Sequence, residues 1–137
     1  MVSVLERIGH AAGLDKELEA LAERVRASVV LIGSANGFGS GIVWDAGVVV
    51  TNNHVVGGDE VEVSPLGGTG RRGRVAARDP RNDLAVIEVG GLELPAAALG
   101  DSAALRVGQV VAAVGNPHGV RGVTTLGIIS AVGEQRR

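Results

Sequence analysis

Val48-Val49-Val50-Thr51-Asn52-Asn53-His54-Val55-Val56 is the stretch around which the rest of the chain is organised. Its β-branched apolar run is typical of a strand and leads into a polar turn that carries a histidine. A second stretch, Asp79 to Val89, has a similar design, because Asp83 stands directly before the apolar run that begins at Leu84. A His and an Asp at strand ends, in this chain order, are two members of a Ser-His-Asp triad.

The residue types explain why such a pair would be useful and also leave other interpretations open. A neutral imidazole accepts a proton from a hydroxyl near physiological pH and returns it to a leaving amine. A carboxylate on the other ring nitrogen fixes the tautomer and stabilises the imidazolium. A His after a strand, however, is more often a solvated loop residue, and an Asp at a strand start is usually a turn or cap residue. The candidate catalytic residues are His54 and Asp83.

Length and composition predict one ordinary domain, or one and a fraction, with an aliphatic core. The 137 residues are 45% apolar but only 1% aromatic, and 22 of them are glycine, which suits tight turns between short strands. The net charge of -2 gives no electrostatic reason to expect nucleic acid or an anionic membrane as a partner. The absence of cysteine excludes disulfides and thiol catalysis, and the three scattered histidines do not suggest a metal site.

The beginning of the chain predicts helices and a cytoplasmic location. Residues 1–8 have no basic n-region or long apolar run, and no stretch of the chain reaches the roughly 20 apolar residues of a membrane span. Residues 1–27 are expected to form one or two short helices. Ser3 and Glu6 make a capping box, Gly13 ends the first helix and Asp15 caps the second. The apolar stripe of the second helix is expected to pack on the body or on a partner; it comprises Leu14, Leu18, Leu21 and Val25.

Residues 28–92 predict a small antiparallel barrel, because short β-branched runs alternate with turn residues. The expected strands are 28–32, 41–44, 47–51, 60–64, 72–78 and 84–89, and residues 33–39 are expected to form a loop. The Arg71–Arg74 cluster is most simply an exposed loop and strand edge, with the steering of an acidic partner as a less favoured alternative.

The remainder predicts a connector and the start of a second barrel. Residues 93–106 form the connector, and residues 107–137 hold two further expected strands, 108–114 and 123–132. A two-stranded hairpin is marginal by itself in water, and its open edges invite pairing. These strands are therefore expected to belong to a barrel that is only begun here, or that another segment completes.

The chain resembles the HtrA/Deg group of trypsin-like serine proteases, from about Leu21 to its last residue. Several segments match the group's motifs in order: Gly39–Val43, Val50–Val56, Asn82–Val86, Leu99–Gly108, Val114–Gly119 and Gly127–Gly133. The resemblance implies an all-β, chymotrypsin-like double barrel and serine endopeptidase activity on unfolded or damaged polypeptides, without metal or cofactor. It makes His54 the general base and Asp83 its orienting partner. It also implies a homo-oligomer, since family members often form trimers, and relatives are often exported or periplasmic.

Two family features are missing from this sequence. The Gly-Asn-Ser-Gly-Gly segment that carries the nucleophile in the family does not occur here, nor does the family's PDZ domain. Gly100-Asp101-Ser102 imitates it, but the resemblance places Ser102 in the connector, and Ser40 and Ser130 fall in strand-like stretches without a Gly-rich anion cradle. The chain by itself is therefore expected to be inactive. Two alternatives remain open: a catalytically inactive protease-fold module that binds peptides or a partner chain, and complementation by a separate chain that donates the Ser.

Overall fold

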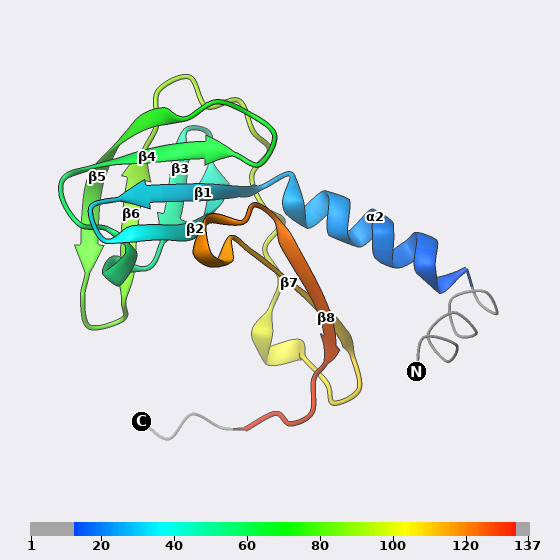
Figure 1. Ribbon diagram of the computed structural model, residues 1–137. Helices are drawn as coiled ribbons and strands as arrows, with labels where there is room; N and C mark the ends of the chain where they lie inside the picture. The colour runs from blue at the N-terminus through cyan, green and yellow to red at the C-terminus, as the bar shows by residue number, and fades with distance from the viewer. Residues whose placement is uncertain (1–12, 134–137) are drawn as a thin grey trace.

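The structure, a computed structural model, describes residues 13–133 of the chain. A six-stranded closed barrel forms its main body, a helix precedes the barrel, and a two-stranded sheet follows it. The helix and the two-stranded sheet both extend from one side of the barrel (Figure 1). The second barrel is only partly present, as expected.

All six strands of the barrel pair antiparallel, in the order β1-β2-β3-β6-β5-β4. Consecutive strands pair except where β3 crosses to β6, and β4 closes the barrel on β1. Closure removes every open edge, which a small sheet otherwise leaves available for aggregation. The strands are β1 (Val29–Ser34), β2 (Gly37–Asp45), β3 (Val48–Thr51), β4 (Glu60–Pro65), β5 (Arg71–Asp79) and β6 (Leu84–Glu88).

An aliphatic core fills the barrel, as the low aromatic content predicts. Alternate residues along each strand point inward because the side-chain period of a strand is two. The inward positions have no exposed surface at Val30, Ile32, Val43, Val63 and Ile87. Burial of one such Val or Ile side chain contributes roughly 1.5–3 kcal/mol. The other core members are Val49, Val56, Val61, Ala85, Val89 and Leu92.

The predicted loop at residues 33–39 is mostly strand. β1 continues to Ser34 and β2 begins at Gly37, so the turn between them is Ala35–Asn36. Glycine disfavours a strand in a prediction from sequence, but here it allows neighbouring side chains to pack closely against the backbone. A Cβ at Gly39 would lie 2.5 Å from Val55, and one at Gly41 would lie 2.7 Å from Val49. These two glycines therefore belong to the barrel wall, where a neighbouring side chain occupies the space of their missing Cβ atoms.

The helix α2 (Leu14–Arg26) confirms the predicted stripe and corrects its cap. Gly13, in a left-handed conformation with φ 62°, is the N-cap residue, whereas Asp15 lies in the first turn. Asp15 still suits that turn, because its charge complements the helix dipole. The half-buried stripe residues Leu21 and Val25 line an apolar groove of about 400 Å³ together with Ile42 of the barrel. The first predicted helix lies outside the described residues. Among the described residues, none of the helices is sufficiently long and apolar to cross a membrane.

The connector leads to a separate antiparallel sheet. It contains a short 3-10 helix, η2 (Ser102–Ala104), in which the Ala103 N–H is capped by the Asp101 carboxylate. β7 (Val110–Gly115) then pairs with β8 (Val123–Ile128) across the 3-10 turn η3 (Pro117–Gly119). The prediction that the last strand continues to residue 132 is wrong. Beyond Ile128 two bonds extend the pairing, from the Gly108 N–H to the Ile129 carbonyl and from the Ile129 N–H to the Gln109 carbonyl. The pairing ends there because the chain enters β7 through the turn Arg106–Gln109, in which Gly108 has a φ of 91°.

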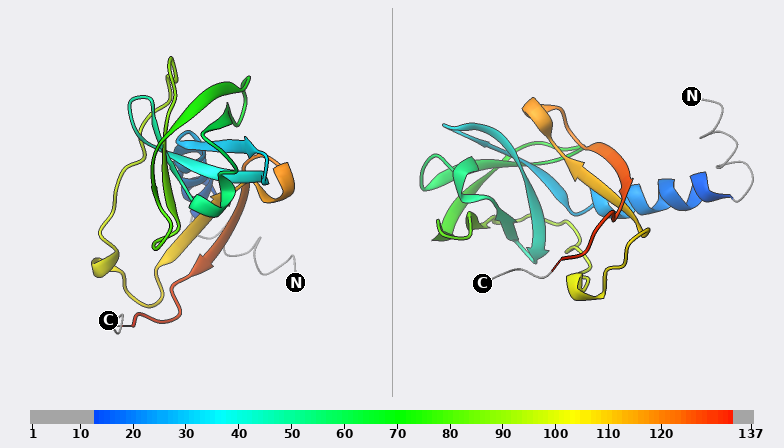
Figure 2. Two further views of the ribbon diagram at one scale, coloured as in Figure 1. Left: turned by 90° about the vertical axis from the view of Figure 1, so that its left-hand side faces the viewer. Right: turned by 90° about the horizontal axis from the view of Figure 1, so that it is seen from below.

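A buried asparagine joins this second sheet to the barrel. Asn116, with 3% of its surface exposed, donates from Nδ2 to the Val30 carbonyl at 2.9 Å, and its Oδ1 accepts from the Gly122 N–H at 2.8 Å. Its backbone N–H donates to the Ser40 hydroxyl at 2.8 Å. Arg121 also donates to the carbonyl of Pro65, at the end of β4, and to that of Gly68 in the turn that follows. Figure 2 shows this sheet beside the barrel wall at that point.

We predict that Asn116→Ala loosens the joint and leaves the barrel folded. The substitution leaves the buried Gly122 N–H without its partner and removes the side-chain hydrogen bond to the Val30 carbonyl, which together cost about 1–3 kcal/mol. Amide hydrogen exchange should accelerate at Gly122 and along β7 and β8, but not in β1 or β6. Thr125→Ala, at an exposed position of the same sheet, is the control. Equal exchange in the two variants would show that Asn116 does not hold the joint.

Candidate active site

Strand pairing brings His54 and Asp83 together although 29 residues separate them. β3 and β6 are antiparallel neighbours, and Thr51 at the end of β3 pairs with Ala85 near the start of β6. The turn that leaves β3 therefore meets the turn that enters β6 at the same end of the barrel. His54 lies in the 3-10 turn η1 (Asn53–Val55), and Asp83 is the residue before β6.

Four hydrogen bonds connect the two turns. The Asp83 carboxylate accepts from the His54 backbone N–H through Oδ1 at 2.9 Å and meets His54 Nδ1 through Oδ2 at 2.6 Å. The Asp83 carbonyl accepts from the Asn53 N–H at 3.1 Å and from the Asn52 side-chain amide at 3.0 Å. Because an ionised carboxylate only accepts hydrogen bonds, the ring proton of neutral His54 lies on Nδ1 and the lone pair lies on Nε2.

A second aspartate shapes the turn that carries Asp83. Asp83 has a φ of 54°, in the left-handed region that few residues other than Gly, Asn and Asp adopt. The preceding turn is closed by Asp79, whose Oδ1 accepts from the N–H groups of Arg81 and Asn82 and whose Oδ2 accepts from the Asn82 amide at 2.6 Å. The hydrogen bond from the Asn82 side chain is the largest cause that lowers the pKa of Asp79.

The β1–β2 turn holds the other side of the histidine turn. Ser34 Oγ donates to the Val55 carbonyl at 2.5 Å, and the Asn36 amide donates to the His54 carbonyl at 3.2 Å. Val55 packs over the Cα of Gly39, where any side chain would collide with it. The backbone of His54 is therefore held by residues from two separate parts of the barrel.

The His–Asp pair is open on its outer side. The side chain of His54 is 72% exposed and that of Asp83 is 44% exposed. Hydrogen bonds from His54, first from its backbone N–H and then from its ring, lower the pKa of Asp83 below the ordinary carboxyl value. Within residues 13–133, no group hydrogen-bonds to His54 Nε2. The arrangement can therefore accept a proton at Nε2 from a hydroxyl brought to it.

The three serines considered from the sequence lie apart from the His–Asp pair. Ser40 lies in β2, as predicted, and its hydroxyl accepts from Asn116 in the joint to the second sheet. Ser102 begins the 3-10 helix of the connector, as the resemblance implied. Ser130 follows β8 instead of lying in a strand, which corrects its predicted placement.

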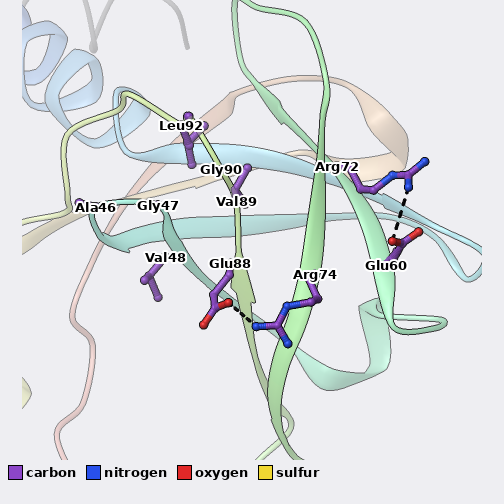
Figure 3. A pocket seen from close by; sticks show the side chains of 11 residues that line it. Ala46, Gly47, Val48, Glu60, Arg72, Arg74, Glu88, Val89, Gly90 and Leu92 are labelled. Atoms are coloured by element: carbon purple, nitrogen blue, oxygen red, sulfur yellow. Dashed lines mark hydrogen bonds and ion pairs between the residues drawn. The ribbon is translucent and has the colours of Figure 1, made fainter.

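A shallow groove of about 790 Å³ lies elsewhere on the barrel (Figure 3). Its lining includes the ion pairs Arg72–Glu60 and Arg74–Glu88 but neither His54 nor Asp83. Arg72 and Arg74 are exposed residues of β5 that pair with carboxylates on neighbouring strands, which agrees with the simple interpretation of the arginine cluster. Exposed ion pairs of this kind contribute little to stability.

Comparison with known proteins identifies the family to which this geometry belongs. The profile of the trypsin-like peptidase domain matches residues 39–137, which include both turns of the His–Asp pair. The chain belongs to the trypsin-like peptidase family. Within it, the relatives are HtrA and DegP proteins, so the resemblance to this group is confirmed.

Three relatives show how far the similarity extends. The chain is 42% identical to chloroplastic Protease Do-like 5 of Arabidopsis thaliana over 75% of its own length and 36% of the relative's. It is 46% identical to the periplasmic serine endoprotease DegP of Salmonella typhimurium over 69% and 21%. The structure of the HtrA-type protease AlgW with tripeptide superposes with a TM-score of 0.76 and 36% identity, over 83% and 40%. This member of the HtrA group thus spans about a fifth to two fifths of the length of these three relatives.

The sequence indicates the pair but not the side chains that hold its turns, since Ser34 and Asn36 are predicted only as part of a loop. Asn116, which joins the second sheet to the barrel, is likewise predicted only as part of a turn. No local pattern marks these residues, because each acts on a segment far away in sequence. The roles of His54 and Asp83 in catalysis, and the cytoplasmic location, stay predictions; several relatives are named periplasmic.

We predict that His54→Ala raises the pKa of Asp83 only part of the way to its ordinary value. The substitution removes the ring donor but keeps the backbone N–H of residue 54, which is the larger cause of the lowered pKa. A ¹³C-carboxyl NMR titration measures the change. Because the folded-state pKa of Asp83 is lowered, its contribution to stability is present above the ordinary carboxyl pKa and is lost as the pH falls through the lowered value. A complete return to the ordinary pKa would show that the backbone bond has no effect.

Proposed function

We propose that the chain is the His- and Asp-bearing part of an HtrA-like serine endopeptidase. One observation carries the proposal: Asp83 binds both the ring and the backbone N–H of His54, at 2.6 and 2.9 Å, and so fixes the imidazole, whose Nε2 has no hydrogen-bond partner within residues 13–133. This is the arrangement a general base needs, because the carboxylate holds the tautomer and stabilises the imidazolium after proton transfer.

In this proposal His54 takes the proton of a serine hydroxyl that lies outside these 137 residues and then donates it to the leaving amine of the peptide bond. Polypeptides are the substrate class, in keeping with the relatives named as endoproteases and the AlgW structure with tripeptide. The proposed division of the chain is a helical segment at 1–27, the barrel at 28–92, the connector at 93–106 and the beginning of the second barrel at 107–137. The proposal also includes a homo-oligomer, for which the only support is the family resemblance.

The test uses the endogenous peptidase that contains this sequence. His54→Ala should lower its kcat by on the order of 10⁴–10⁶, as for other triad histidines, with a smaller but large loss for Asp83→Asn. Steady-state hydrolysis of an unfolded protein substrate measures both. The 137-residue chain alone should remain unlabelled by a serine-directed fluorophosphonate. An unchanged kcat in His54→Ala, or labelling lost in Ser102→Ala, would contradict the proposed roles.

The alternative function, a protease-fold module that binds peptides or a partner chain, is favoured by one observation. Within residues 13–133, β7 and β8 pair only with each other, and Val110, Leu126 and Ile128 on them are at least half exposed. Such a sheet edge accepts an added strand. Thr125→Pro should then abolish peptide capture by the chain, measured by fluorescence anisotropy, while Thr125→Ala should preserve it. The intact mass of the endogenous product separates the two functions, since a mass well above 13.8 kDa favours the endopeptidase.

A further inference from the structure

A single arginine holds the segment that carries His54. Arg78 lies near the end of β5, and its Nη1 donates to Asn53 Oδ1 at 3.0 Å and to the Val56 carbonyl at 3.2 Å. Its Nη2 donates to the Gly58 carbonyl at 2.6 Å. The three acceptors lie on both sides of His54 in sequence. The guanidinium therefore spans the turn from the residue before the histidine to the loop after it.

Two other arginines of β5 form ion pairs with carboxylates, which Arg78 does not do within the described residues. Arg72 and Arg74 pair with Glu60 and Glu88 across neighbouring strands, whereas no carboxylate of residues 13–133 lies within ion-pair distance of Arg78. The charge of Arg78 meets only neutral oxygens of the 53–58 segment. A planar fork with several fixed N–H donors suits three oxygens at different positions, which a lysine ammonium matches less well.

A β-bulge in β5 explains why Arg78 faces this turn. The pairing with β6 runs Arg74 with Glu88 and Val75 with Ile87, and then skips to Ala77 with Val86 and Arg78 with Ala85. Residues directly opposite each other in antiparallel strands share a face of the sheet. In a regular strand without this register shift, position 78 would stand opposite the exposed Leu84 and follow Arg74 on the outer face of the barrel.

With the bulge, Arg78 stands opposite Ala85, which is 1% exposed and belongs to the barrel core. At this end of β5, the inward face of the strand lies against the η1 turn. The bulge therefore directs the Arg78 side chain toward the segment that carries His54 and away from the outer surface of the barrel. Bulges next to active sites commonly redirect a side chain in this way.

We infer that Arg78 is a positioning residue for His54, which it holds against Asp83 by fixing both flanks of the η1 turn. The inference rests on the proposed function, in which the geometry of this pair matters for proton transfer. Arg78 does not touch the imidazole. It acts through Asn53, Val56 and Gly58, and so confines the backbone N–H and the ring of His54 to the positions where the Asp83 carboxylate accepts from both.

The experiment uses the 137-residue chain labelled with ¹⁵N. Arg78→Met keeps an unbranched, flexible apolar stem and removes the guanidinium fork. Amide hydrogen exchange of His54, Val55 and Val56, which all donate hydrogen bonds in the turn, should accelerate by about tenfold or more. The ¹⁵N shifts of the His54 ring should move away from the pure Nδ1–H tautomer. Arg78→Lys should restore part of both signals, and Asn53→Ala, which removes one of the three acceptors, should give a smaller change than Arg78→Met.

Arg74→Met is the matched control, because it removes an arginine from the same strand and breaks only the pair with Glu88. It should leave the turn and the ring shifts unchanged, and both Met variants should keep the slow exchange of the barrel core. If Arg78→Met and Arg74→Met behave alike while Asp83→Asn changes the His54 ring shifts, the inference is wrong and the proposed function stands. If Asp83→Asn also leaves the ring shifts unchanged, both are wrong.

Discussion

The register between β3 and β6 is the constraint on which the rest of the site depends. Pairing of Thr51 with Ala85 sets two strand ends side by side, and the residues just beyond those ends are the ones that carry the imidazole and the carboxylate. A slip of one residue would reverse the faces of the whole strand and expose the buried valine and isoleucine positions to water. The free energy of core burial therefore also fixes the relative position of His54 and Asp83.

Strand pairing alone is not sufficient, because turns at strand ends are mobile unless their polar groups are satisfied. In this barrel each of the two turns has its own bracing. Asp79 closes the turn that sets the left-handed backbone of Asp83, while Ser34, Asn36 and Arg78 hold the segment around His54. Polar side chains from β1–β2 and β5 thus converge on one end of the barrel, although the histidine itself remains exposed to solvent.

The same barrel also supplies the attachment for the second sheet. Asn116 binds the Val30 carbonyl, the Ser40 hydroxyl and the Gly122 N–H from a buried position, so the β7–β8 sheet is seated on the outside of β1 and β2. Ser40 is thereby explained as a structural acceptor between two glycines of the barrel wall. In an endopeptidase whose nucleophile comes from the second barrel, this joint would set the distance between the nucleophile and His54.

The class of the fold and the candidate pair could be inferred from the sequence, because β-branched runs, turn residues and family motifs are all local patterns. The sequence predicted the aliphatic core, the six barrel strands and the positions of His54 and Asp83. It misplaced the cap of α2, the 33–39 loop and the end of the last strand, since close packing and a positive φ at Gly108 override local preference there. Which side chains hold the turns of His54 and Asp83 could be seen only in the folded structure. In the sequence, Arg78 is one of several arginines in a charged strand, and no pattern distinguishes it. The bulge shifts the register of β5 and so directs the Arg78 side chain toward the His54 segment.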